Sequence, residues 1–145
     1  MALRSTARPV GAAPIDRTED HRAQFVTSWL PPTTALISAH GDIDASNASG
    51  LAEYAMAHTE DAACLMLDLT GVGFFGTAGF AALNTVDTSW SRRGLDWMLI
   101  PGDAVNRLLR ICDPDYRLQR RNTVPAALSA LRGETPLLQL VAQSR

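Results

Sequence analysis

One hydroxyl group stands where a glycine-rich segment of the chain gives way to a helical pattern. An apolar run over residues 65–69 predicts a strand that is covered on both faces of a sheet. Four glycines follow at positions 71, 73, 76 and 79, and apolar residues then recur at helical spacing up to Trp90. Thr77 is therefore expected at or beside the amino end of a helix, on a rim where loops carry function.

Two kinds of chemistry suit a hydroxyl at this position. As a helix cap, Thr77 would accept a hydrogen bond from a backbone N–H and add about 1 kcal/mol of stability. As a phosphate carrier, it would place the phosphate among free N–H groups at the positive end of the helix dipole. The phosphate would also add a charge of about −2 to the surface without unfolding the domain. The two roles are compatible.

Nucleotide binding and catalysis find less support in the same segment. Residues 71–76 match the spacing G-x-G-x-x-G, and Asp96 lies 20 residues beyond Gly76. However, Phe74 and Phe75 stand where small residues must let a pyrophosphate approach, and Asp96 belongs to the start of a strand. Residues 76–79 are one residue too short for a nucleophile elbow. Positions 21, 40 and 58 hold the histidines, without metal-ligand spacing. We therefore expect no enzyme, metal or cofactor.

The pattern along the chain predicts a ββαβαβαβα order. Strands are expected over residues 23–30, 34–44, 65–69, 95–100 and 116–120, and helices over residues 44–58, 77–90, 103–112 and 123–131. Asp44, Asp103 and Thr123 are expected to cap the first, third and fourth helices. This order indicates an α/β fold, a mostly parallel mixed sheet that begins with an antiparallel hairpin and carries about four helices.

The segment around Thr77 resembles the signature of the STAS domain family. In that family an apolar strand ends in Asp-Leu and leads to Phe-x-Asp-Ser-Ser-Gly-Leu-Gly. Here the strand ends in Asp68 and Leu69, and residues 74–81 read FFGTAGFA. Thr77 falls on the family's phosphorylated serine, whereas Gly76 replaces the preceding aspartate. Upstream, residues 41–44 read GDID, which is similar to the family's Gly-x-(apolar)-Asp.

The resemblance implies one STAS-type domain over residues 21–132, between tails at 1–20 and 133–145. It implies an anti-sigma factor antagonist, which binds an anti-sigma factor kinase of the histidine-kinase-like ATPase fold and frees a sigma factor. Thr77 would be the phosphoacceptor. The partner-binding residues carried over are Asp44, Gly76, Thr77, Ala78, Gly79 and Phe80. Two alternatives stay open: a small-ligand or nucleotide-sensing STAS module, and an antagonist controlled without phosphorylation, for example by redox state.

Cys64 and Cys112 are the residues that a redox mechanism would use. Each is most simply a core residue, and Cys112 lies on an apolar helical stripe. The alternative is that both lie at one end of the sheet and form a redox pair.

Composition sets the remaining expectations. A chain of 145 residues with net charge −2 suits one domain and gives no field that attracts nucleic acid. Two cysteines, and no apolar stretch of a signal peptide or a membrane span, point to a cytoplasmic protein without membrane contact. Its expected partner is another protein, and a weak homodimer is a further expectation.

Overall fold

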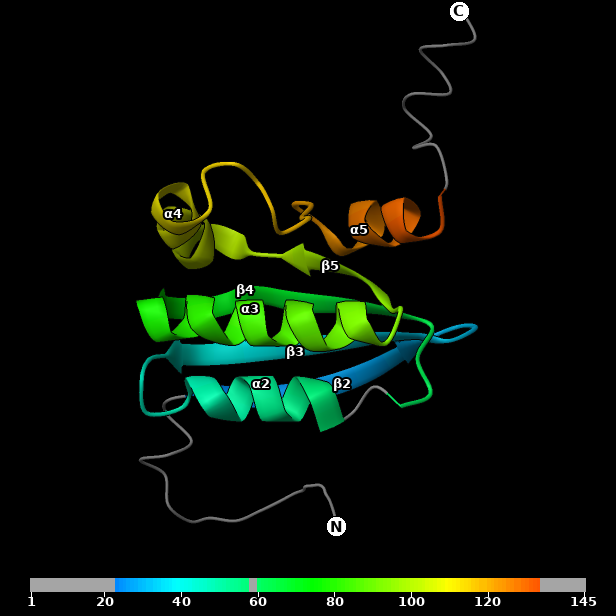
Figure 1. The fold of residues 1–145 in the computed structure, drawn as a ribbon, viewed down its shortest axis with the longest axis horizontal. Coiled ribbons are helices and arrows are strands. Elements are labelled where there is room, and N and C mark those ends of the chain that lie inside the picture. Colours follow the sequence, from blue (N-terminus) through cyan, green and yellow to red (C-terminus); the bar gives the residue numbers. More distant parts are fainter. Residues whose placement is uncertain (1–22, 58–59, 134–145) are drawn as a thin grey trace, which may run out of the picture.

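The computed structural model describes residues 23–57 and 60–133, which form a four-stranded sheet with four helices (Figure 1). The sheet order is β2-β3-β4-β5, where β2 pairs antiparallel with β3 and the other neighbours are parallel. The strands are β2 (Ala23–Leu30), β3 (Thr34–Ile43), β4 (Cys64–Phe75) and β5 (Asp96–Ile100). The predicted α/β class, initial hairpin and mixed sheet are confirmed. The two expected tails, apart from Gly133, lie outside the described residues, as do His21 and His58.

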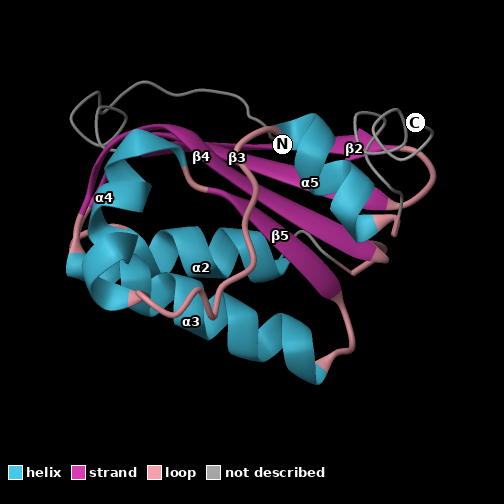
Figure 2. Ribbon diagram, turned by 90° about the horizontal axis from the view of Figure 1, so that it is seen from above, coloured by secondary structure: helices cyan, strands magenta, loops and turns pink. Residues whose placement is uncertain are grey.

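The helices divide between the two faces of the sheet. They are α2 (Ala48–Ala57), α3 (Thr77–Arg92), α4 (Gly102–Cys112) and α5 (Val124–Leu131). Figure 2 shows α2 and α3 side by side on one face, α5 on the other, and α4 at the end where β4 finishes. Both layers cover β4: Leu65 and Leu67 belong to the larger core, and Met66 packs beneath α5 with Ala127. The apolar run at 65–69 therefore has the predicted cause, burial on two faces.

β4 is longer than its apolar run predicted. It continues through the glycine-rich segment to Phe75, because β3 supplies a pairing partner as far as the pairs Asp42–Phe74 and Ile43–Phe75. Register shifts near His40 and Asp42 absorb the irregularity. Close backbone approach explains one of these glycines, since a Cβ on Gly71 would lie 3.0 Å from the His40 side chain.

The strand predicted over residues 116–120 does not form. The segment makes an isolated bridge to β5, in which Leu99 accepts from the Arg121 N–H at 2.9 Å and donates to Gln119 at 3.0 Å. The N–H groups of Arg117 and Leu118 instead donate to the Asp113 carboxylate, both at 3.0 Å. This capture curls the segment around Asp113, so the described order is ββαβαβαα.

The predicted caps have different outcomes. Thr123 caps α5 as expected, its hydroxyl accepting from the Ala126 N–H at 3.2 Å. The Asp103 prediction is wrong, because α4 begins at Gly102 after an N-cap at Pro101, which leaves Asp103 inside the first turn. Gly102 needs its glycine, with φ of +78° and a Cβ position 2.7 Å from the Thr70 Cα.

Candidate functional site

The ends of β3 and β4 and the start of α3 meet at one edge of the sheet. The Gly76 N–H donates to the Ile43 carbonyl at 3.0 Å, directly beyond the last β3–β4 pair. This bond fixes the turn into α3 beside the turn that follows β3. We call the resulting surface the rim and define it as Asp44, Phe74 and residues 76–80. The structure thus gathers the sequence-predicted partner-binding residues in one place.

Thr77 is the first residue of α3 and is exposed. The N-cap is Gly76, whose extended backbone (φ −88°, ψ 177°) precedes the helix and whose side-chain position offers no capping bond. The capping role expected of Thr77 is therefore wrong by one residue, since a cap side chain must belong to the residue before the first helical one. No acidic residue lies in the first turn of α3. The positive end of the helix dipole has no carboxylate there to offset it.

The geometry at Gly76 would accept a side chain. Its φ is an ordinary negative value, and a Cβ would meet the Phe74 ring at 3.4 Å and the Ile43 carbonyl oxygen at 3.8 Å. These are ordinary van der Waals contacts. The backbone therefore does not require glycine where the family has aspartate, so the missing acid changes the chemistry of the rim rather than its shape.

The other predicted helix residues support the rim more than they form its surface. Gly79 is buried, and Ala78 and Phe80 are half-buried against the main core. A Cβ on Gly79 would lie 2.6 Å from the Phe75 ring, so glycine is required for α3 to pack this closely on β4. On α3, Thr77 is the rim residue that is exposed to a partner.

Phe74 is a rim residue that the sequence reasoning did not assign to the site. It is 53% exposed, whereas neighbouring Phe75 is buried. The two-residue period of a strand explains the contrast, because successive side chains point to opposite faces. Because the predicted strand ended at residue 69, this period was not expected to continue to Phe74. An exposed aromatic ring beside Thr77 suits contact with another protein.

Asp44 shapes the turn that leads into α2 rather than capping the helix directly. Its carboxylate accepts from the Ser46 N–H at 2.9 Å and from the Ser46 hydroxyl. Its carbonyl accepts from the Ala48 N–H at 2.9 Å. Asn47 braces the same turn, accepting from the Asp44 N–H and donating to the Asp42 carbonyl, both at 2.9 Å. The bonds from Ser46 and Ala48 to Asp44 have the pattern of a helix cap. They close a turn over residues 45–47, before the first helical residue at Ala48, so Asp44 caps the turn that leads into α2.

The two cysteines do not share an end of the sheet. Cys64 is the first residue of β4, and Cys112 is the last residue of α4, which both views place where β4 finishes (Figures 1 and 2). Both are free thiols. Burial and the nearby Asp96 charge raise the pKa of Cys64, and the charge of Arg132 offsets only part of this rise. The raised pKa makes the reactive thiolate form of Cys64 scarcer. The geometric premise of the redox pair is wrong.

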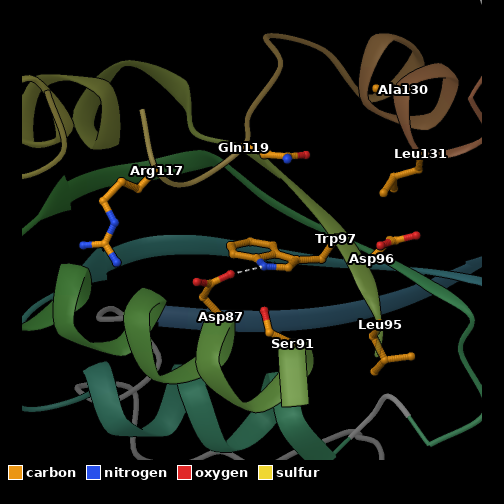
Figure 3. Close-up of a pocket in the computed structure, with 9 residues that line it drawn as sticks. All are labelled: Asp87, Ser91, Leu95, Asp96, Trp97, Arg117, Gln119, Ala130 and Leu131. Carbon is orange, nitrogen blue, oxygen red and sulfur yellow. Dashed lines mark hydrogen bonds between the residues drawn. The ribbon is translucent and has the colours of Figure 1, made fainter. Parts of the chain in front are cut away.

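A small cavity of about 240 Å³ lies away from the rim, at the amino end of β5 (Figure 3). Its wall includes Trp97, whose ring N–H donates to Asp87 at 2.8 Å, and Asp96. Asp96 pairs in register with Cys64, at the start of both strands. The acid that a dinucleotide site would need is therefore at the wrong end of the sheet for the glycine-rich segment, in agreement with the sequence argument against that site.

The profile of the STAS domain family matches residues 30–127, so the chain belongs to the STAS domain family. The chain is 26% identical over 100 residues to Osmosensory protein A of Mycobacterium tuberculosis. The aligned region covers 69% of this chain and 60% of that protein. The chain thus spans about 60% of the length of this curated relative.

Solved structures share the fold at low identity. An anti-sigma factor antagonist from Mycobacterium paratuberculosis aligns with a TM-score of 0.65 and 22% identity, covering 77% of this chain and 96% of that one. The anti-sigma factor antagonist SpoIIAA in its unphosphorylated form aligns with a TM-score of 0.62 and 12% identity, and the alignment covers 77% of this chain and 99% of that one. These likenesses establish a common architecture.

The described residues also bear on metal binding and on membrane insertion. Within residues 23–57 and 60–133, no group of three or more His, Cys, Asp and Glu side chains is arranged to hold a metal ion. Within the same ranges, no helix has the length and apolar character needed to cross a membrane.

Proposed function

We propose that this chain is an anti-sigma factor antagonist that uses the rim to bind an anti-sigma factor. The partner is a kinase of the histidine-kinase-like ATPase fold, and its capture in the cytoplasm frees a sigma factor. The observation that carries the proposal is the exposed Thr77 hydroxyl at the start of an α3 that lacks both a capping side chain and an acid in its first turn. The family membership and the architecture shared with anti-sigma factor antagonists support the same role.

The same position supports reversal of binding by phosphorylation. The γ-phosphoryl group of ATP passes to Thr77 Oγ1, ADP leaves, and the hydroxyl proton goes to a base of the kinase. The phosphate stays on a surface that stabilises it, because the dipole and N–H groups of α3 favour an anion there. It also places a charge of about −2 beside exposed Phe74. Charge beside an apolar contact opposes docking of the kinase.

Gly76 tunes this regulation. The family acid beside the hydroxyl is absent, and the structure gives no steric reason for its absence. We infer that Thr77 is a slower phosphoacceptor than a serine preceded by aspartate, so the unphosphorylated, binding-competent form persists longer.

The test is a reconstitution with a histidine-kinase-like anti-sigma factor from the same genome and its sigma factor. The chain is added to the preformed sigma–anti-sigma complex, and released sigma factor is measured by size-exclusion chromatography. ATP is then supplied, and the phosphorylated residue is mapped by mass spectrometry. The proposal expects release without ATP, and recapture with phosphate on Thr77 after ATP is added. No release by any such anti-sigma factor of the genome would contradict the antagonist role, and phosphate found only at another residue would contradict the role of Thr77.

A further inference from the structure

A second cavity, larger than the first, opens between α4 and the segment that links it to α5. Its volume is about 560 Å³, within the range of about 300–1,000 Å³ that small-molecule sites occupy. It is lined by Pro101, Asn106, Arg110, Asp113, Pro114, Tyr116, Arg120, Arg121 and Asn122. None of these residues belongs to the rim.

The lining is positively charged although the chain is not. The lining contains three arginines and one aspartate, whereas the whole chain carries a net charge of −2. The Asp113 carboxylate already has partners within the chain, because it accepts from Arg120 Nη1 at 3.0 Å and from the N–H groups of Arg117 and Leu118. Arg110 and Arg121 are exposed at the cavity and face no other acid among its lining residues. The charge available to a ligand is therefore positive.

Arg120 is held in place before any ligand arrives. Its side chain is 8% exposed and that of Asp113 is 3% exposed, and a second bond joins Arg120 Nη2 to the Asp113 carbonyl at 3.3 Å. The backbone is fixed as well, because Gln119 and Arg121 both hydrogen-bond to Leu99 of β5. A guanidinium has five N–H donors, so these two bonds leave donors for a ligand. A positioned guanidinium loses less freedom on binding an oxyanion.

Tyr116 adds an aromatic wall. Arg120 stacks over its ring, with the guanidinium carbon 3.9 Å from the ring centre. Tyr116 is 69% exposed, and its φ of +58° is in the left-handed region that a non-glycine residue seldom occupies. A large exposed ring held on a strained backbone is a feature that concentrates at binding sites. Asn106 of α4 and Asn122 of the linking segment add neutral hydrogen-bonding groups to the lining.

We propose that this cavity binds a small organic phosphate monoester. Arg110 and Arg121 would take the phosphate oxygens with paired N–H donors, beside the fixed guanidinium of Arg120, since guanidinium groups match phosphate geometry. The organic group would lie along Tyr116. The site is separate from the rim, so the chain has a small-ligand site in addition to its protein-binding surface.

The test is titration of the ¹⁵N-labelled chain with phenyl phosphate in a buffer free of phosphate and sulfate, followed by amide NMR. Saturable shifts are expected at Asn106, Tyr116 and Asn122, weakening as salt is added. Inorganic phosphate should bind at least several-fold more weakly, and phenol should not bind. Equal binding of inorganic and phenyl phosphate would overturn the organic part of the proposal, and absence of saturable shifts would overturn the whole.

Variants locate the contacts. Arg110→Gln and Arg121→Gln should each weaken phenyl phosphate binding by about tenfold, the usual effect of losing one charge-assisted contact. Arg107→Gln is the matched control, because Arg107 is an exposed arginine of α4 that does not line the cavity. All three positions are exposed, so the spectra should show folded proteins. An equal loss in Arg107→Gln would mean that net charge, not this cavity, draws the ligand.

Discussion

The ring of Phe75 occupies the space that a side chain on Gly79 would need. A Cβ at that glycine would lie 2.6 Å from the ring, far inside van der Waals contact. The pair brings the last residue of β4 and the first turn of α3 into direct contact. The orientation of α3, and with it the position of Thr77, depends on this fit.

Gly79→Ala should therefore destabilise the protein by about 1–3 kcal/mol, the usual cost of overpacking a core. Urea unfolding followed by circular dichroism measures the change. Gly50→Ala is the matched control, since Gly50 lies in α2 with nothing within 4 Å of its Cβ position. Because alanine favours helix, this control should stabilise the protein by about 0.5–1 kcal/mol. A neutral Gly79→Ala would mean that Phe75 or α3 moves aside without cost.

Gly76→Asp should speed phosphorylation of Thr77 by the proposed partner kinase, because it restores the acid that the family places beside the hydroxyl. The variant should also be more stable by a few tenths of a kcal/mol, roughly the advantage of Asp over Gly at an N-cap. Initial rates with labelled ATP provide the measurement. Gly76→Asn is the control, because it caps the helix without adding charge. A rate that is unchanged in Gly76→Asp would show that the acid at this position has no role in the transfer.

Asp113→Asn should lower stability by about 3–5 kcal/mol at pH 7, because it leaves the buried Arg120 without its counter-charge. Burial opposes ionisation of Asp113, but hydrogen bonds from Leu118 and Arg117 and the charge of Arg120 lower its pKa below the ordinary value. A depressed carboxyl pKa stabilises the fold above the unfolded value of about 3.9, and this contribution is lost as the pH falls through the folded value.

The difference between Asp113→Asn and the unchanged chain should therefore shrink below about pH 4. Denaturant titrations at several pH values would show it. Asp115→Asn serves as the control, since Asp115 is an exposed neighbour. A constant difference across the acid range would show that the charge on Asp113 does not stabilise the fold.

Oxidation of the chain should give no internal disulfide between Cys64 and Cys112, because the structure places them at opposite ends of the sheet. Mass spectrometry after mild oxidation and alkylation of remaining thiols provides the measurement. A Cys64→Ser variant controls for disulfides between molecules. Detection of a peptide that links the two cysteines in the monomer would require a different fold.

Periodicity and turn residues predicted most of the architecture, because the hairpin, the doubly covered strand and α5 each depend on local signals. Thr123 illustrates this: its side chain caps a helix that begins at the next residue. The errors have non-local causes. Residues 71–75 form a strand despite their glycines, because β3 pairs with them. Residues 116–120 do not form a strand, because the N–H groups of Arg117 and Leu118 donate to Asp113.

The candidate site was predicted unevenly for the same reason. The position of Thr77 at the start of α3 followed from sequence spacing and from the family resemblance. The exposure of Phe74 required the strand to extend to residue 75, which only pairing with β3 establishes. The proposed phosphate-binding cavity is formed by α4 and by the segment that hydrogen-bonds to Leu99. No sequence pattern predicts that α4 and this segment lie side by side.

The most direct test of the proposed function is calorimetric titration of the anti-sigma factor with Thr77→Glu and Thr88→Glu. Both threonines are exposed on α3, and they differ in that Thr88 lies about three turns beyond Thr77, outside the rim. We predict that Thr77→Glu weakens binding at least tenfold with an unchanged circular dichroism spectrum, whereas Thr88→Glu binds like the unchanged chain. Equal affinity of Thr77→Glu and the unchanged chain would contradict the assignment of the rim as the binding surface.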